Sequence, residues 1–279
     1  MLRALLHYGM PQVPFGLLNQ AMGMADRFIL GLYMPLREVG LYLIGSTIAG
    51  VVKFYPVAFE AAWMPFAYDS LKRQDAAELF ARLGTYAFAL LVLLTVALAG
   101  LAPLAVRIAL PAEYQPVAPL IPILTLAMAV QALSWFLVTS LNVAKQTRVY
   151  PVVTGFGAAA SITANLLLIP PFGMWGAAVA LVVSQTLATG VTAYFAQRAY
   201  RIPYEIGRLA KVAGMGALTY GAMAAVTAAS AWQALLIRTA LLTLFPIGLL
   251  VLRFFGPREM GELRRFLESR TLSPVPTDT

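Results

Sequence analysis

The chain has 279 residues, of which 60% are hydrophobic and only 11% charged, and its formal net charge is +8. A soluble domain carries about 25% charged residues, because its surface must face water. The depletion of charge therefore excludes an ordinary soluble protein. The absence of cysteine excludes disulfide bonds and thiolate metal sites.

Long uncharged runs cover 83–106, 114–144 and 212–237, and each is longer than the roughly 20 residues that a helix needs to cross a bilayer. A fourth run, 149–197, is interrupted only by the turn residues Pro170–Gly173. Lipid offers no hydrogen bonds to the backbone, so only helices and closed barrels span membranes. Barrel strands alternate in polarity, whereas these runs are continuously apolar. We therefore predict an all-α membrane protein.

We expect about eight transmembrane helices of bilayer-spanning length. The predicted spans are 8–33, 39–67, 79–107, 116–142, 149–169, 174–197, 210–229 and 233–254. Proline and glycine mark the predicted boundaries at Met34–Leu36, Leu110–Ala112 and Ile202–Pro203.

The distribution of lysine and arginine predicts the orientation. Most of these residues lie in the terminal segments and in the even-numbered connections, whereas only Arg27, Arg37, Arg107 and Arg238 lie on the other side. Cytoplasmic connections are enriched in Lys and Arg, so we expect both termini in the cytoplasm. The basic excess is then explained by topology, and no nucleic-acid partner is predicted.

Two cytoplasmic features fit this orientation. Asp75 and Glu78 resemble a capping box that would begin the third helix, with the Asp75 side chain as N-cap. The segment 257–267 is predicted to form a short amphipathic helix that lies on the inner leaflet.

Two charged residues fall within the second predicted span. Lys53 and Glu60 lie two helical turns apart and would share one face, with Pro56 between them. A proline inside a helix removes a backbone donor and favours a kink, here near Val52. A translocation cavity would use such a polar face. Two structural roles would explain the same charges inside the span. Lys53 and Glu60 would form ion pairs with neighbouring helices, or the Lys53 side chain would extend to the membrane interface.

Asp26 and Arg27 lie late in the first predicted span and point about 100° apart around the helix. One would pair with another helix while the other faces a cavity or the outer surface, although a role as topology anchor fits equally well. Further polar residues at or near membrane depth are Asn19, Gln20, Gln131, Asn142, Asn165 and Gln185. Interhelical hydrogen bonding is the role expected for most of them. Because there is no metal-ligand spacing, phosphate-binding glycine loop or nucleophile motif, we predict transport rather than an enzyme, with no cofactor or metal.

Several segments resemble a known family in order and spacing. They are Tyr8–Pro14, Ala25–Gly31, Val39–Tyr42, Trp63–Phe66, Leu141–Arg148, Asn165–Pro170 and Phe172–Ala178. Together they resemble the second half of the bacterial polysaccharide and O-antigen flippases. These form the oligosaccharidyl-lipid branch of the multidrug/oligosaccharidyl-lipid/polysaccharide exporter superfamily.

The resemblance implies a substrate and a site. Members move undecaprenyl-pyrophosphate-linked oligosaccharides across the bacterial inner membrane, for lipopolysaccharide O-antigen and exopolysaccharide synthesis, by alternating access. Arg27 and Lys53 would contact the pyrophosphate or acidic sugars. Glu60 would balance charge or couple transport to an ion, and Asp26 is a fourth candidate in the substrate-binding region.

The resemblance also implies a domain organisation. Family members have two six-helix bundles. Here 1–200 would be the second bundle, 201–256 two additional transmembrane helices, and 257–279 the cytoplasmic amphipathic helix and tail. We therefore expect the first bundle, or a second copy of the chain, as a partner. The alternatives are half of a cation-coupled multidrug antiporter and a non-transporting membrane remnant or scaffold.

Overall fold

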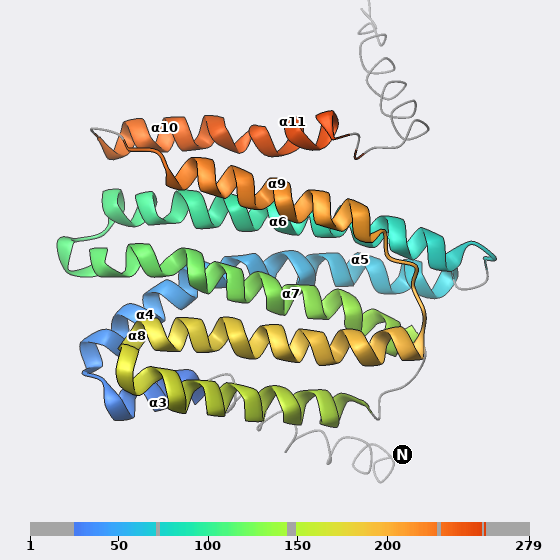
Figure 1. The fold of residues 1–279 in the computed structure, drawn as a ribbon, viewed down its shortest axis with the longest axis horizontal. Helices are drawn as coiled ribbons and strands as arrows, with labels where there is room; N and C mark the ends of the chain where they lie inside the picture. The colour runs from blue at the N-terminus through green and yellow to red at the C-terminus, as the bar shows by residue number, and fades with distance from the viewer. Residues whose placement is uncertain (1–24, 71–72, 144–148, 228–229, 253, 255–279) are drawn as a thin grey trace, which may run out of the picture.

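The computed structural model describes residues 25–70, 73–143, 149–227, 230–252 and 254, and no described residue lies in a strand. Long helices run side by side along one axis in successive layers (Figure 1). They are α3 (Ala25–Tyr33), α4 (Leu36–Ala49), the 3₁₀ helix η1 (Gly50–Lys53), α5 (Phe54–Ser70), α6 (Ala76–Ala109), the 3₁₀ helix η2 (Ala112–Leu120), α7 (Ile121–Val143), α8 (Tyr150–Ala199), α9 (Ile206–Ala224), α10 (Ala231–Leu242) and α11 (Leu244–Val251).

Five stretches of the described residues are long and apolar enough to cross a membrane. They are Leu36–Ala67, Ala76–Ala109, Ala112–Val138, Tyr150–Ala199 and Ala231–Val251. The prediction of an all-α membrane protein is confirmed. Helix α9 is not among the five; it carries Arg208 and Lys211 near its start and lies along α6 (Figure 1).

Two predicted segments fall partly or wholly outside the described residues. Of the first predicted span only Ala25–Tyr33 is described, so the family-like segment Tyr8–Pro14 lies outside. The predicted amphipathic helix at 257–267 lies outside as well.

The second predicted span changes direction where the sequence places its kink. Helix α4 gives way to η1, and α5 follows at once with Pro56 as its third residue. A proline there cannot donate to the carbonyl of Val52, so the tighter 3₁₀ turn lies just where the α-helical ladder is incomplete. Figure 1 shows α4 running obliquely and α5 running parallel to α6.

Aromatic rings fix α5 between its neighbours. The ring of Phe59 lies 4.9 Å from that of Phe136 on α7, measured between centroids, and Trp63 lies 5.4 Å from Phe80 on α6. Such edge-to-face pairs add to the energy of burial. They hold the second half of the kinked span in one position relative to α6 and α7.

Helix α8 is a hairpin of two antiparallel halves, as the Pro170–Gly173 turn predicts (Figure 1). Gly173 has φ 55° and ψ −133°, a conformation that residues with a side chain rarely adopt. A Cβ atom on Gly176 would collide with the carbonyl group of Leu168, so the two halves meet backbone to backbone. Glycine at these positions makes the reversal possible.

Methionine side chains fill the space beside glycines where α9 packs on α6 and where α11 packs on α9. A Cβ on Gly100 of α6 would collide with Met223 of α9, and a Cβ on Gly248 of α11 would collide with Met215 of α9. Flexible methionine fills such irregular gaps well. Close approach at small residues is also how helices associate in lipid.

The predicted capping box at the start of α6 is wrong. Asp75 occupies the N-cap position, but its side chain accepts no hydrogen bond from the helix backbone. Both carboxylate oxygens instead accept hydrogen bonds from Arg73, each at 2.9 Å. This bidentate pair outcompetes a single neutral backbone donor, since charge-assisted hydrogen bonds are stronger.

Candidate functional site

The Asp26 carboxylate joins α3 to α4. The hydroxyl of Tyr42, a fully buried residue, donates a hydrogen bond of 2.7 Å to Asp26 Oδ2. Asp26 Oδ1 accepts a second bond, of 2.9 Å, from the backbone N–H of Arg27. Both carboxylate oxygens therefore have donors, and the acid is held in one place inside the helix layers.

Arg27 and Lys53 lie around this carboxylate. Arg27 is half-buried, and its Nε atom is buried without a hydrogen-bond partner among the described residues. The charges of Asp26 and Arg27 both act on the Lys53 ammonium group. We call Asp26, Arg27, Tyr42 and Lys53 the charged cluster. It holds two cations and one carboxylate. Both candidate site residues of α3, Asp26 and Arg27, belong to it.

One cation of the charged cluster lies inside a membrane-spanning stretch. Lys53 falls near the middle of the membrane-spanning stretch Leu36–Ala67. A lysine at the centre of a bilayer costs about 2.5–3.5 kcal/mol on insertion scales. Charged residues at such positions normally line a water-filled cavity or pair with an opposite charge. The carboxylate near Lys53 is that of Asp26, which already accepts a hydrogen bond from Tyr42.

The structure does not bring Glu60 into this cluster. Glu60 is exposed on α5, whereas Lys53 is half-buried at the end of η1. No ion pair between these two residues exists in the described part of the chain. The sequence predicts that Lys53 and Glu60 share one helix face, whereas the charges that act on Lys53 in the structure are those of Asp26 and Arg27 on α3.

Asn165 does not make the interhelical bond expected from the sequence. Its amide nitrogen donates within α8, to the backbone oxygen of Ser161 at 2.9 Å. Its Oδ1 atom is buried without a described donor. A buried polar atom of this kind costs free energy unless something satisfies it.

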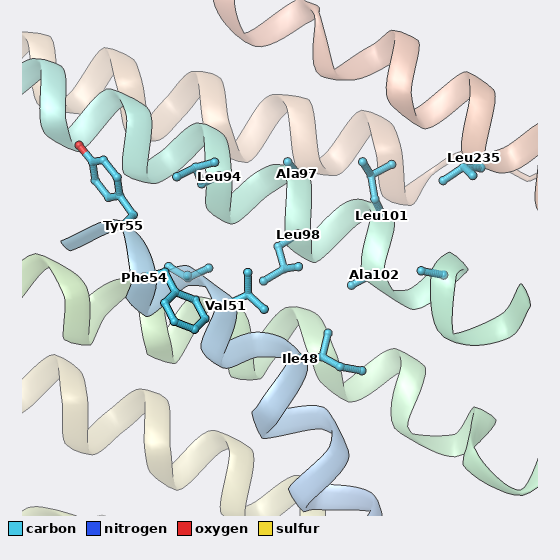
Figure 2. A pocket seen from close by; sticks show the side chains of 12 residues that line it. Ile48, Val51, Phe54, Tyr55, Leu94, Ala97, Leu98, Leu101, Ala102 and Leu235 are labelled. Carbon is cyan, nitrogen blue, oxygen red and sulfur yellow. The ribbon is translucent and has the colours of Figure 1, made fainter. Parts of the chain in front are cut away.

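An apolar groove of about 740 Å³ lies beside the charged cluster, and sequence reasoning did not identify it. It runs along α6 between the kink of the second span and α10, and no charged residue lines it (Figure 2). Ala97, Leu101 and Ala105 recur every four residues on the α6 wall. This helical stripe with two small side chains is the signal that could have indicated a groove.

The groove and the charged cluster occupy different sides of η1. Side chains three residues apart eclipse one another in a 3₁₀ helix. Val51 and Phe54 form one row, and Val52 and Tyr55 form a second; both rows line the groove. Lys53 belongs to the third row and is not among the lining residues. The kink thus presents apolar surface to one side and a cation to the other.

No group of histidine, cysteine, aspartate or glutamate that could hold a metal ion occurs among the described residues. The chain matches no protein-family model, no curated protein and no solved structure. The resemblance to the flippases therefore stays a prediction carried by the sequence segments alone.

Proposed function

We propose that this chain is part of a flippase for undecaprenyl-pyrophosphate-linked oligosaccharides in the bacterial inner membrane, with both termini in the cytoplasm. The observation that carries the proposal is the charged cluster. It brings two cations, one of them in a membrane-spanning stretch, near a single carboxylate that Tyr42 already engages.

The chemistry of the cluster suits a phosphate-bearing substrate. The Arg27 guanidinium has a planar set of donors that matches phosphate oxygens, and its buried Nε lacks a described partner. Lys53 adds a compact charge that a pyrophosphate, with two phosphoryl groups, would engage beside the guanidinium. With two cations and one carboxylate, the cluster keeps an excess positive charge.

A second bundle would complete the cavity. Helix α5 presents an exposed face that includes Glu60 and Val57, the latter with 52% of its surface accessible. Two rocking bundles that share one site near the bilayer midplane are a common arrangement in transporters. We assign the exposed face of α5 to the first bundle, or to a second copy of this chain.

The alternative of a cation-coupled drug antiporter has one supporting observation. Asp26 is a half-buried acid whose charge acts on Lys53 inside a membrane-spanning stretch, and acids so placed relay protons in transporters. In that case the essential group is Asp26, and the cations are not needed for substrate binding. The two functions therefore differ in which charge of the cluster must be kept.

Binding of the lipid-linked substrate tests the proposal first, because half a cavity can bind even where it cannot transport. The purified chain in lipid nanodiscs is titrated with undecaprenyl-pyrophosphate oligosaccharide. We expect Arg27→Gln and Lys53→Gln each to weaken binding by about tenfold or more, as for the loss of a hydrogen bond to a charged group. Arg37→Gln, at an exposed arginine near the start of α4, is the matched control.

Unchanged binding in both Arg27→Gln and Lys53→Gln would overturn the proposal. Weakened binding of a cationic drug in Asp26→Asn, with no effect of the two cation variants on either ligand, would favour the antiporter. Where the chain binds the lipid, flipping is then measured in vesicles with the first bundle added.

A further inference from the structure

A second group of cations lies where α6, α9 and α10 meet. Arg238 of α10 donates from Nη1 to the backbone oxygen of Gly100 on α6, at 3.0 Å. Its Nε atom is buried without a hydrogen-bond partner in the described part of the chain. The charge of Arg107 on α6 acts on Arg238, as does the hydroxyl group of Tyr220 on α9. We call these three residues the arginine site.

Among the described residues, no carboxylate balances the arginine site. The ion pairs within the described ranges, such as those of Arg73 and Arg208, lie elsewhere, and no acidic residue is among the groups that act on Arg238. Two guanidinium groups in electrostatic range repel each other more strongly where water is scarce. An anion between them would remove the repulsion and satisfy the buried Nε of Arg238.

The arginine site lies at one end of the apolar groove. Leu235, one turn before Arg238 on α10, lines the groove (Figure 2). Ala105, two residues before Arg107 on α6, lines it as well. The groove extends from there along α6 as far as Leu94. A molecule with an anionic group at the arginine site would therefore have a purely apolar channel directly beside it.

The position of the arginine site along α6 fits a lipid headgroup. Helix α6 has 34 residues, which corresponds to about 51 Å, whereas the hydrocarbon core of a bilayer is about 30 Å thick. Arg107 lies two residues from the end of α6 and is exposed. It therefore lies at headgroup level, while Arg238 is hydrogen-bonded at Gly100, about 10 Å deeper along α6.

We propose that the arginine site binds the phosphate of an anionic membrane phospholipid, and that an acyl chain of this lipid lies in the groove. Arg107 and Arg238 engage the phosphate oxygens, and the Tyr220 hydroxyl donates a further hydrogen bond. The groove volume of about 740 Å³ lies within the range of roughly 300–1,000 Å³ found for ligand pockets. This site is separate from the charged cluster and does not depend on the proposed transport function.

The bound lipid would join three helices. Its phosphate contacts α6, α9 and α10, and its chain contacts α6, α10 and the kink of the second span. It would therefore strengthen the attachment of α9–α11 to the rest of the molecule. A ligand that binds only the folded state stabilises it by mass action.

Binding of phosphatidylglycerol to the purified full chain in detergent, measured by native mass spectrometry, tests the proposal. We expect Arg107→Gln and Arg238→Gln each to weaken binding by about tenfold, as expected for one lost hydrogen bond to a charged group. Arg37→Gln removes the same charge from an exposed position on α4 and should bind like the parent. Ala105→Trp fills the groove without removing a charge, and it should also weaken binding.

Three results would overturn the proposal. The first is equal binding of phosphatidylglycerol to the parent and to Arg107→Gln, a variant at an exposed position that decides the matter even if Arg238→Gln fails to fold. The second is unchanged binding in Ala105→Trp, which would leave no role for the groove. The third is competition by inorganic phosphate at concentrations equal to those of the lipid, which would show an anion site rather than a lipid site.

Discussion

The helices α3–α8 and the helices α9–α11 are held together in different ways. In the first region, side-chain hydrogen bonds cross between helices: Tyr42 of α4 donates to Asp26 of α3, and Thr189 of α8 donates to the carbonyl of Val130 on α7 at 3.1 Å. In the second region, methionine side chains enter spaces left by glycine, as at Gly100. The first region is thus held together partly by polar side chains in its interior, whereas the second is held together chiefly by close apolar packing.

The difference has a functional meaning. Apolar packing is the economical way to join helices in lipid, because interhelical hydrogen bonds contribute only about 0.6 kcal/mol on average there. Under the proposed function, the half-buried carboxylate and the two cations of the first region serve the substrate as well as cohesion. In the second region Lys211 of α9 donates to the backbone oxygen of Leu252 at 3.0 Å, and Arg238, to which the arginine site is assigned, donates to that of Gly100.

The largest effect is expected at the hairpin of the first region. Gly176→Ala places a Cβ against the carbonyl group of Leu168, so the two halves of α8 must separate. We expect the free energy of unfolding, measured in mixed micelles, to fall by about 4 kcal/mol or more, a size that is exceptional for a point substitution and diagnostic of a severe clash. In Gly190→Ala, on the same half of α8, the new Cβ meets nothing within 4 Å. Equal stability of the two variants would contradict the backbone contact.

A smaller effect is expected where the second region packs on α6. Gly100→Val drives a side chain into Met223, and overpacking of this kind costs about 1–3 kcal/mol. Because methionine is flexible, the substitution Met223→Ala should recover much of the loss. A double-mutant cycle of unfolding free energies measures this coupling. If the effects of the two substitutions simply add, the glycine–methionine contact does not hold α9 in place.

The hydrogen bond of the charged cluster should contribute less than either packing contact. Tyr42→Phe removes the donor to Asp26 Oδ2 and leaves a charged acceptor with one fewer partner. We expect a cost of about 1–2 kcal/mol, again measured in mixed micelles. Tyr33→Phe is the control, since half of the Tyr33 surface is exposed on the same helix pair. If Tyr42→Phe and Tyr33→Phe lower the free energy of unfolding equally, the hydrogen bond to Asp26 contributes no more to stability than an exposed tyrosine hydroxyl does.

Features governed by the local backbone could be predicted from the sequence. Proline and glycine restrict the backbone wherever they occur, so the hairpin at Pro170–Gly173 and the break before Pro56 were both predicted correctly. The apolar runs likewise predicted the long helices, because lipid leaves the backbone no other means of satisfying its hydrogen bonds.

Contacts between helices could not be predicted in this way. Periodicity pairs Lys53 with Glu60 on one helix, but the groups that act on Lys53 come from α3. The apolar groove was missed for a similar reason. Its walls combine α6, α10 and the kink, and only the packing of these elements decides whether small residues on α6 leave a space or receive a neighbour.

The hydrogen-bond partner of the Asp75 side chain could not be predicted from the sequence either, and its effect on the carboxyl group can be measured. Hydrogen bonds from Arg73 lower the pKa of the Asp75 carboxyl, and the charges of Arg73 and Arg82 act in the same direction. A depressed pKa means that the pair stabilises the folded chain above the ordinary Asp pKa. This contribution disappears as the pH falls through the lowered value.

We expect Arg73→Gln to return the Asp75 titration midpoint, followed by carboxyl NMR, to near the ordinary aspartate value. Arg82→Gln should move it much less, because Arg82 contributes the weakest of the named influences. The melting temperature in detergent should hardly change in either variant, since the pair is exposed and such pairs contribute little. A clear drop in melting temperature with Arg73→Gln would instead show that this pair fixes the start of α6, in the role that the sequence assigned to a capping box.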